Sequence, residues 1–318
     1  MGRESDIKPI TGGGPLAGKV ALVAGATRGA GRAIAVELAR SGAFVYATGR
    51  SSRTTGPSEL DRPETIEETE ELMKEAGGEG KSLRVDHLEP GQVDELVKLM
   101  ERERGRLDIL VNDIFGGDRY MQWDKPLWEH DLDGGLRMLR MGVDTHLITI
   151  AKTMRLLLDG KSGLVIEVTD GTAKFNANFR RNVGFYYDLV KANIDRVVKG
   201  LNVELSDLPV VALGVTPGWL RSETMLDNFA VREDNWREAC RATPGFAISE
   251  SPTYIGRGVA ALAGDGEARR FGGQILTSRQ LADTYGFTDT DGSRPDCWGF
   301  LEKYGIDYEG SEGIDDFR

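Results

Sequence analysis

The sequence predicts an α/β fold: a doubly wound, seven-stranded parallel sheet in a single domain with a C-terminal extension. Short apolar segments alternate with segments of helical periodicity from residue 19 onward. A glycine-rich turn joins the first apolar segment to the first helical one, and no change of composition marks a second domain before residue 278. Strands and helices that alternate in this way bury a parallel sheet between two layers of helices.

The elements follow from their hydrophobic patterns in chain order. Apolar runs predict buried strands at 19–25, 44–49, 81–86, 107–112, 163–169, 210–215 and 272–277. Helical patterns cover 31–42, 65–78, 91–105 and 136–160, and another helix carries Tyr187 and Lys191 and ends near residue 206. Residues 52–64 and 113–135 are rich in turn-forming residues and are predicted to be loops; two or three short helices precede the last strand.

Composition and charge exclude several kinds of function. The net charge of −11 and pI of about 5.0 argue against a nucleic-acid partner, because phosphate binding needs clustered Lys and Arg. Two distant cysteines and three histidines without ligand spacing predict neither a disulfide framework nor a metal site. No apolar run has the ~20 residues of a membrane span, and the first residues lack the apolar centre of a signal peptide. These features predict a cytoplasmic protein without a membrane partner.

A glycine-rich turn at residues 25–31 predicts a dinucleotide site. Gly25, Gly29 and Gly31 lie between the first strand and the first helix, and Thr27, Arg28 and Ala30 complete the turn. Glycines let the backbone approach a pyrophosphate, and the N–H groups and dipole at the start of a helix favour its negative charge. The turn is therefore predicted to bind the cofactor phosphates.

The end of the second strand indicates which dinucleotide is bound. An acidic residue there would bind the ribose 2′-hydroxyl of NAD, but this strand is followed by Arg50 and Ser51. Arg28 in the glycine turn adds a second guanidinium, and guanidinium groups bind phosphate well. The cofactor is therefore predicted to be NADP(H).

Tyr187 and Lys191 predict acid/base chemistry. Their four-residue spacing places a phenol and an ammonium on one face of a helix, where the ammonium favours the phenolate. Enzymes with such a pair usually carry a serine at the end of the preceding strand, but here that position reads Thr169-Asp170-Gly171-Thr172. Thr169, Asp170 and Thr172 are the candidates to replace it, with Asp170 in register; a turn-capping role for Asp170 is equally possible on the sequence.

With these motifs the chain, from about Gly18 to Thr277, resembles the short-chain dehydrogenase/reductase family, which has a Rossmann-type fold. The spacing is similar to an uncharacterised bacterial branch, here with the catalytic serine replaced. The resemblance extends to further cofactor-binding positions: Asp86 and His87 near the adenine, Asn112 after the fourth strand, and Pro217, Gly218, Trp219 and Leu220 over the nicotinamide.

The resemblance implies roles and an organisation. Tyr187 would exchange a proton with the substrate oxygen, and Lys191 would bind the nicotinamide ribose, in an NADP(H)-dependent oxidoreductase acting on a small carbonyl/alcohol pair. Residues 1–17 would form a flexible arm, 18–277 the catalytic domain and 278–318 an extension. A homodimer or homotetramer is expected. The alternatives are a sensor or scaffold that binds NADP without turnover, a lyase or epimerase, and an imine reductase.

Two departures from the family pattern concern the site. The long helix carries Arg140, Met141 and Gly142 where the family has an asparagine that relays protons. The segment from Asp170 to Tyr187 is longer than usual, and the insertion contains Lys174, Arg180 and Arg181. These basic residues would either meet an anionic substrate or be solvated, and the sequence favours solvation.

Overall fold

The structure, a computed structural model, describes residues 13–160, 162–305 and 312–318. Its centre is a seven-stranded sheet in the order β3-β2-β1-β4-β5-β6-β7, in which each neighbouring pair is parallel. The strands are β1 (Val20–Ala24), β2 (Phe44–Gly49), β3 (Glu79–Arg84), β4 (Ile109–Asn112), β5 (Gly163–Val168), β6 (Val210–Thr216) and β7 (Ile275–Thr277). The predicted doubly wound, Rossmann-type sheet is confirmed.

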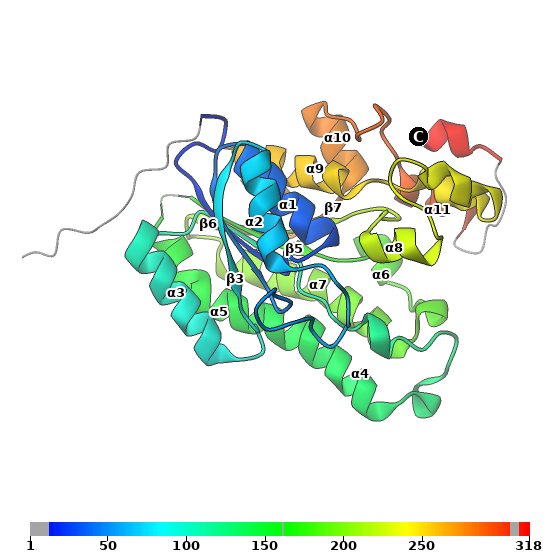
Figure 1. Ribbon diagram of the computed structural model, residues 1–318, viewed down its shortest axis with the longest axis horizontal. Coiled ribbons are helices and arrows are strands. Elements are labelled where there is room, and N and C mark those ends of the chain that lie inside the picture. Colours follow the sequence, from blue (N-terminus) through cyan, green and yellow to red (C-terminus); the bar gives the residue numbers. More distant parts are fainter. Residues whose placement is uncertain (1–12, 161, 306–311) are drawn as a thin grey trace, which may run out of the picture.

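Helices cover both faces of the sheet (Figure 1). The helices from α1 to α9, apart from two short ones, are α1 (Gly29–Arg40), α2 (Ile66–Glu75), α3 (Pro90–Arg104), α4 (Leu132–Leu139), α5 (Thr145–Leu158), α7 (Phe185–Glu204) and α9 (Pro252–Gly264). The short ones are α6 (Ala173–Asn176), α8 (Glu223–Asn228), α10 (Ser278–Tyr285) and α11 (Cys297–Tyr304). None of the helices in the described part of the chain has the length and apolarity needed to cross a membrane.

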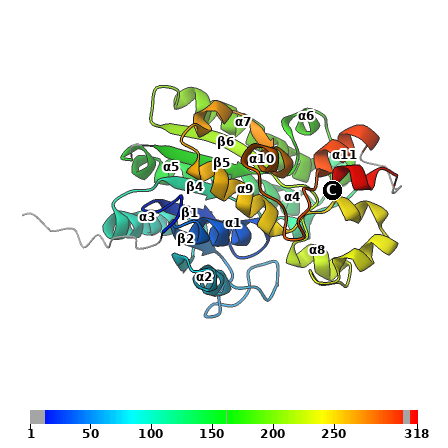
Figure 2. The same ribbon diagram turned by 90° about the horizontal axis from the view of Figure 1, so that it is seen from above.

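Two apolar cores lie on opposite faces of the sheet because successive strand residues point to opposite sides. Ala21 and Val23 of β1 join the core under α1, α2 and α9. Val20 and Leu22 of the same strand join the core under α3 and α5. Figure 1 shows α9 above the strands and α3 and α5 below them, and Figure 2, seen from above, shows β2, β1, β4, β5 and β6 in that order across the sheet.

The strand order reverses between β1 and β4, since β2 lies on one side of β1 and β4 on the other. Ligands of open parallel sheets bind outside the carboxyl ends of the strands at such a reversal. The turn from β1 to α1 and the segment after β4 meet there, because the N–H of Asp113 donates to the carbonyl of Ala24 at 2.9 Å. The fold thus places the glycine turn beside the residues that follow β4.

The structure corrects three details of the predicted elements. The segment 113–135 is not wholly a loop, since it contains 3₁₀ turns at 118–120 and 127–129 and the start of α4. A π-helical turn at 140–144 joins α4 to α5 within the predicted long helix. Leu16, in the predicted flexible arm, is fully buried, and its N–H bonds the carbonyl of Ser41 at 2.9 Å, whereas residues 1–12 lie outside the described part.

Candidate functional site

The glycine turn from β1 to α1 is built around close backbone approaches. Gly25 has a φ of +90°, and a Cβ there would overlap the carbonyl of Asp113. A Cβ on Gly31 would overlap the carbonyl of Gly25. Gly29, at the start of α1, has a φ of +57° and donates its N–H to the carboxylate of Glu223 on α8 at 2.8 Å. Side chains are therefore excluded at Gly25 and Gly31, and an anionic group already lies at the helix N-terminus.

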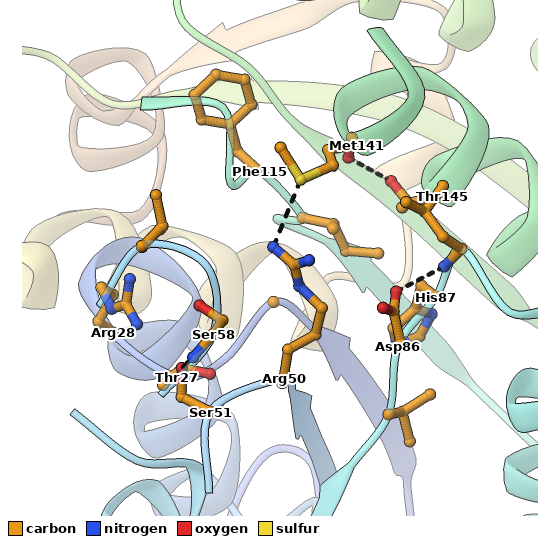
Figure 3. A pocket seen from close by; sticks show the side chains of 16 residues that line it. Thr27, Arg28, Arg50, Ser51, Ser58, Asp86, His87, Phe115, Met141 and Thr145 are labelled. Carbon is orange, nitrogen blue, oxygen red and sulfur yellow. Dashed lines mark hydrogen bonds between the residues drawn. The ribbon is translucent and has the colours of Figure 1, made fainter. Parts of the chain in front are cut away.

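A pocket beside this turn is formed by the ends of β2 and β3, by the π-helical turn at 140–144 and by the start of α5 (Figure 3). Seven of the predicted cofactor residues line it: Gly25, Thr27, Arg28, Arg50, Ser51, Asp86 and His87. Its volume of about 80 Å³ is well below the ~300 Å³ at the low end of ligand pockets. In this structure Arg50 crosses the pocket, as Figure 3 shows, so the pocket has to widen to admit a nucleotide.

Both arginines predicted to hold a phosphate already contact carboxylates. Arg50 donates to Glu59 at 2.5 Å, and the guanidinium of Arg28 lies 3.2 Å from Glu64. Glu59 also accepts from Arg137 at 2.8 Å. Burial would raise the pKa of Glu59, but hydrogen bonds from Arg137, a tyrosine and Arg50 lower it to about 2. The loop after β2 therefore places anionic groups where the sequence predicts the 2′-phosphate.

His87 and Asn112 are both buried, and only His87 lines the pocket. His87 is held between the hydroxyls of Thr48 and Thr149, at 2.9 and 2.7 Å, and burial lowers the pKa of its ring to about 4. Asn112 is fully buried in β4 and donates to Glu167 at 2.7 Å. Asn112 thus contacts β5 in this structure, and its side chain does not line the pocket.

Tyr187 and Asp170 are in direct contact. The Tyr187 hydroxyl donates to Oδ2 of Asp170 at 2.9 Å, and Nη1 of Arg180 donates to the same oxygen at 3.2 Å. Burial raises the pKa of Tyr187 well above its ordinary value, and the negative charge of Asp170 adds to the effect. The prediction that the turn after β5 supplies a polar group beside Tyr187 agrees with this geometry.

The two threonines of that turn are engaged elsewhere. Thr169 donates its hydroxyl to the backbone carbonyl of Lys191 at 2.8 Å, which ties β5 to α7. The Thr172 hydroxyl accepts from the N–H of Phe175 at 3.2 Å and caps α6. Among the three candidates to replace the serine, Asp170 is therefore the one whose side chain contacts Tyr187.

Phe115 connects the catalytic pair to the nucleotide pocket. Lys191 Nζ lies 4.0 Å from the centre of the Phe115 ring, and the Tyr187 ring packs edge-on against Phe115 with centres 5.6 Å apart. Phe115 also lines the pocket described above. Burial lowers the pKa of Lys191, and nearby carboxylates oppose that shift. Phe115 therefore lies between the Tyr–Lys pair and the pocket beside the glycine turn.

The segment after β6 lies across the site. The N–H of Gly218 donates to Oε2 of Glu250 at 2.8 Å, and Leu220 pairs with Glu250 in an isolated parallel bridge. The Pro217 carbonyl accepts from the indole of Trp298 at 2.8 Å. Trp219 packs edge-on against Phe246, with ring centres 5.1 Å apart. This segment is thus fastened to a buried carboxylate and to the C-terminal extension.

One expectation for the inserted loop is wrong. The sequence favours a solvated Arg180, but only 8% of this residue is exposed, and its Nε and backbone N–H donate to Asp188 at 3.2 and 3.0 Å. Lys174 and Arg181 are exposed, as expected for solvated side chains. Sequence reasoning also missed Glu59, Glu223 and Glu250, because no sequence pattern links them to the residues that they contact.

Comparisons with known proteins agree with this arrangement. The family model described as short chain dehydrogenase matches residues 19–232. The chain is 31% identical over 284 residues to Dehydrogenase/reductase SDR family member 1 of Mus musculus, covering 87% of this chain and 85% of that protein. It is 26% identical over 225 residues to the 7alpha-hydroxysteroid dehydrogenase of Clostridium sardiniense, covering 70% of this chain and 78% of that protein.

Two solved structures share the fold. Carveol dehydrogenase from Mycobacterium avium, in complex with NAD, superposes with a TM-score of 0.68 at 21% identity and covers 83% of this chain and 97% of its own. A short chain dehydrogenase from Shigella flexneri 2a strain 301, complexed with NADP, gives 0.65 at 19% identity and covers 83% and 98%. At this level of identity the likeness concerns the fold alone.

Proposed function

The chain belongs to the short-chain dehydrogenase/reductase family, and we propose that it is an NADP(H)-dependent oxidoreductase that interconverts a small carbonyl compound and its alcohol. The observation that carries the proposal is Phe115, which lines the nucleotide pocket and contacts both Tyr187 and Lys191. Hydride transfer to or from a bound substrate requires an acid/base pair close to a phosphate-binding turn, and here one aromatic ring lies between the two.

The residues at the glycine turn fit a nicotinamide dinucleotide. Gly25 and Gly31 leave the space that any Cβ would fill, and the start of α1 presents the N–H of Gly29 to an anion. Arg28 and Arg50 favour the additional phosphate of NADP(H), because both guanidinium groups lie in the pocket at the end of β2. When bound, the nicotinamide supplies or accepts the hydride.

Tyr187 holds or delivers the proton of the substrate oxygen in this proposal. Lys191 supplies positive charge one helical turn away and would hold the nicotinamide ribose. Burial disfavours the charged forms of both residues in the ligand-free protein, which raises the pKa of Tyr187 and lowers that of Lys191. The carboxylate of Asp170 beside the phenol also suits a reacting carbon with positive character, which makes a cyclic imine a second candidate substrate.

Substitution of Tyr187 tests the proposal. A panel of ketones, aldehydes and cyclic imines is screened with NADPH, and Tyr187→Phe is expected to lower turnover of the best substrate by about 10²–10⁴-fold, the usual contribution of a positioned acid or base. Tyr186→Phe is the matched control, because Tyr186 is buried and its ring packs on His130. Tight NADPH binding with no turnover of any substrate in the panel contradicts the proposal and favours a sensor.

We also propose a homodimer or homotetramer. Apolar side chains are exposed on α4, α5 and α7, namely Leu136, Leu147 and Leu189, each between 45% and 48% exposed. Burial of such side chains against a second copy stabilises association. Light scattering that shows a monomer at micromolar concentration contradicts this assembly.

A further inference from the structure

The carboxylate of Asp170 is the centre of a cluster that the proposed mechanism leaves unused. Its Oδ2 accepts from Tyr187 at 2.9 Å and from Nη1 of Arg180 at 3.2 Å. Nη2 of Arg180 donates to the backbone carbonyl of Asp170 at 3.1 Å. Two parallel donors from one guanidinium therefore fix both the backbone and the side chain of Asp170.

Arg180 is itself held by a second carboxylate. Asp188, the residue after Tyr187 on α7, accepts from the backbone N–H of Arg180 at 3.0 Å and from its Nε at 3.2 Å. Arg180 and Asp188 are 8% and 6% exposed. A guanidinium buried between two carboxylates keeps its charge and its orientation. It therefore holds Oδ2 of Asp170 as a hydrogen-bond acceptor between the guanidinium and the phenol of Tyr187.

Asp170 is also the exposed end of this cluster. Its side chain is 38% exposed, whereas those of Arg180 and Asp188 are 7% and 9% exposed. One carboxylate oxygen thus contacts the phenol, and the side chain as a whole still reaches water. A proton that passes from the substrate to the phenol of Tyr187 can therefore reach solvent through the carboxylate of Asp170, which is one hydrogen bond away.

We propose that Asp170 is the proton acceptor and donor for Tyr187, so that protons pass between substrate and solvent through Tyr187 and Asp170, with Arg180 as the positioning residue. The inference rests on the proposed function and adds to it the route of the proton. In this role Asp170 does not donate to the substrate oxygen as the family serine is expected to do.

The step balances for alcohol oxidation. The alcohol O–H bond breaks and its proton binds the Tyr187 oxygen, while the proton of Tyr187 moves to Oδ2 of Asp170. The carbinol carbon loses its hydride to the oxidant that the proposed function names, an oxidised nicotinamide dinucleotide, and becomes a carbonyl carbon. Asp170 then releases its proton to water. Carbonyl reduction follows the same route in reverse.

The relay explains how a strongly basic phenol functions here. Burial and the charge of Asp170 raise the pKa of Tyr187 well above its ordinary value. A tyrosine that receives one proton while it gives up another never has to exist as a free phenolate. The charged and titratable groups that act on this pair are Arg180 from the loop, Lys191 from α7, Asp118 from the segment after β4 and Cys297 from α11.

Removal of the carboxylate is the first test. Asp170→Asn keeps the shape but cannot take up a proton, so turnover should fall by at least about 100-fold. Asp170→Ser, which restores the family hydroxyl, should lose as much. Asp207→Asn, at an exposed turn between α7 and β6, is the matched control. A serine variant that turns over at the wild-type rate overturns the relay, since a hydroxyl cannot serve as the base.

Chemical rescue separates proton transfer from a structural role. Formate or acetate added to Asp170→Gly should restore turnover in proportion to the basicity of the added carboxylate, because Asp170 is open to solvent. Rates measured in mixtures of H₂O and D₂O report how many protons move in the transition state. Two should move in the wild type and one in Asp170→Asn. If added carboxylates do not rescue turnover, and if the number of transferred protons is the same in Asp170→Asn as in the wild type, the proposal is overturned.

Arg180 is tested through the pH profile. Arg180→Met removes the charge that favours the ionised carboxylate, so the acidic limb of kcat should move to higher pH, while Arg180→Lys should restore part of the shift. A profile that is unchanged in both variants contradicts a positioning role. Circular dichroism shows whether an Arg180 variant is misfolded. If it is, the Asp170 variants alone test the proposed proton route.

A readout without turnover separates this inference from the proposed function. Ultraviolet titration of the ligand-free protein, with Tyr187→Phe subtracted, reports the ionisation of Tyr187. In Asp170→Asn its midpoint should fall, because the neighbouring negative charge is gone. If the midpoint does not move, the coupling of Asp170 to Tyr187 is refuted, whatever the substrate. If it moves but no carbonyl or imine is turned over, the proposed function fails instead.

Discussion

Glu223 of α8 bonds Gly29 at the start of α1: its carboxylate accepts the backbone N–H at 2.8 Å. The same carboxylate lies 3.5 Å from the guanidinium of Arg32. The start of α1 is where the pyrophosphate of a dinucleotide would bind, because helix N-termini attract anions. In this structure Glu223 therefore satisfies the N–H group that the cofactor would use.

The first prediction follows from this competition. Glu223→Gln should bind NADPH about fivefold more tightly, since a hydrogen bond to a charged group is stronger by about 1 kcal/mol than a neutral one and has to be broken first. Isothermal titration calorimetry measures the change, and Glu238→Gln, at an exposed position, serves as control. If the Kd for NADPH is the same in Glu223→Gln as in the wild type, breaking the bond between Glu223 and Gly29 does not weaken cofactor binding, and the prediction is wrong.

The second prediction concerns the choice of cofactor. The Arg28→Ala/Arg50→Ala variant should lose most of its preference for NADPH over NADH, because each charge-assisted contact to a phosphate contributes ~1.5–3 kcal/mol. Kd values for both nucleotides are compared in the wild type and the variant. A double variant that retains the full preference contradicts the assignment of these two arginines.

Glu59 and Glu64 add a control to that experiment. Both carboxylates contact the two arginines in the ligand-free protein. Glu59→Gln removes the charge opposite Arg50 and should strengthen NADPH binding more than NADH binding, because only NADPH carries a phosphate for the freed guanidinium. If the Kd values of NADPH and NADH change by the same factor, the 2′-phosphate does not bind at Arg50.

The third prediction concerns the buried carboxyl of Glu250. Burial raises its pKa to about 8, although hydrogen bonds from Ser278 and the N–H of Gly218 oppose the shift. The folded protein therefore binds a proton that the unfolded chain releases near pH 4.5. Its contribution to the free energy of unfolding is full below about pH 4.5, and it is lost as the pH rises towards about 8.

Glu250→Gln places an uncharged side chain of similar shape at this position at every pH. The variant should therefore not lose this contribution to the free energy of unfolding as the pH rises. Urea unfolding at pH 5 and pH 9 measures it: the wild type should be destabilised relative to the variant at pH 9 and much less at pH 5. The difference between the two proteins isolates Glu250 from the other acids. A pH-independent difference contradicts a raised pKa.

The fourth prediction separates the threonines after β5. Thr172→Ala removes the N-cap of α6 and should lower the free energy of unfolding by about 1 kcal/mol, with turnover changed only a few-fold. The Thr169 hydroxyl bonds the carbonyl of Lys191, so Thr169→Val should disturb the position of Lys191 and lower turnover more than stability. Thermal unfolding and steady-state kinetics distinguish the two outcomes, and a loss of turnover at Thr172 comparable to that at Asp170 would contradict this division.

The sheet was predictable because its evidence is local. The buried strands β1 and β4 consist largely of consecutive apolar residues, and that pattern alone predicts them. The glycine turn was also predictable, because the spacing of Gly25, Gly29 and Gly31 between a strand and a helix is visible in the sequence, although the carbonyl that Gly25 approaches belongs to Asp113. The Tyr–Lys pair follows from the helical repeat alone. These parts are patterns of residues that are close in sequence.

The rest of the candidate site depends on contacts that the sequence does not show. Glu223 and Gly29 are 194 residues apart in the chain, and no pattern links them. Arg180 resembles any loop arginine until Asp188 and Asp170 are brought around it by the fold. Helical structure in 113–135 was missed because short 3₁₀ turns lack a period long enough to detect.

Phe175 of the inserted loop and Trp298 of the C-terminal extension pack edge-on, with ring centres 5.1 Å apart. The indole of Trp298 is bonded in turn to the Pro217 carbonyl, in the segment predicted to cover the nicotinamide. The inserted loop precedes α7 in the sequence and the C-terminal extension follows it. The two segments thus pack together on the structure. Swapping the loop or the tail alone from a relative would leave an unmatched aromatic surface, so attempts to redesign substrate preference have to exchange both segments together.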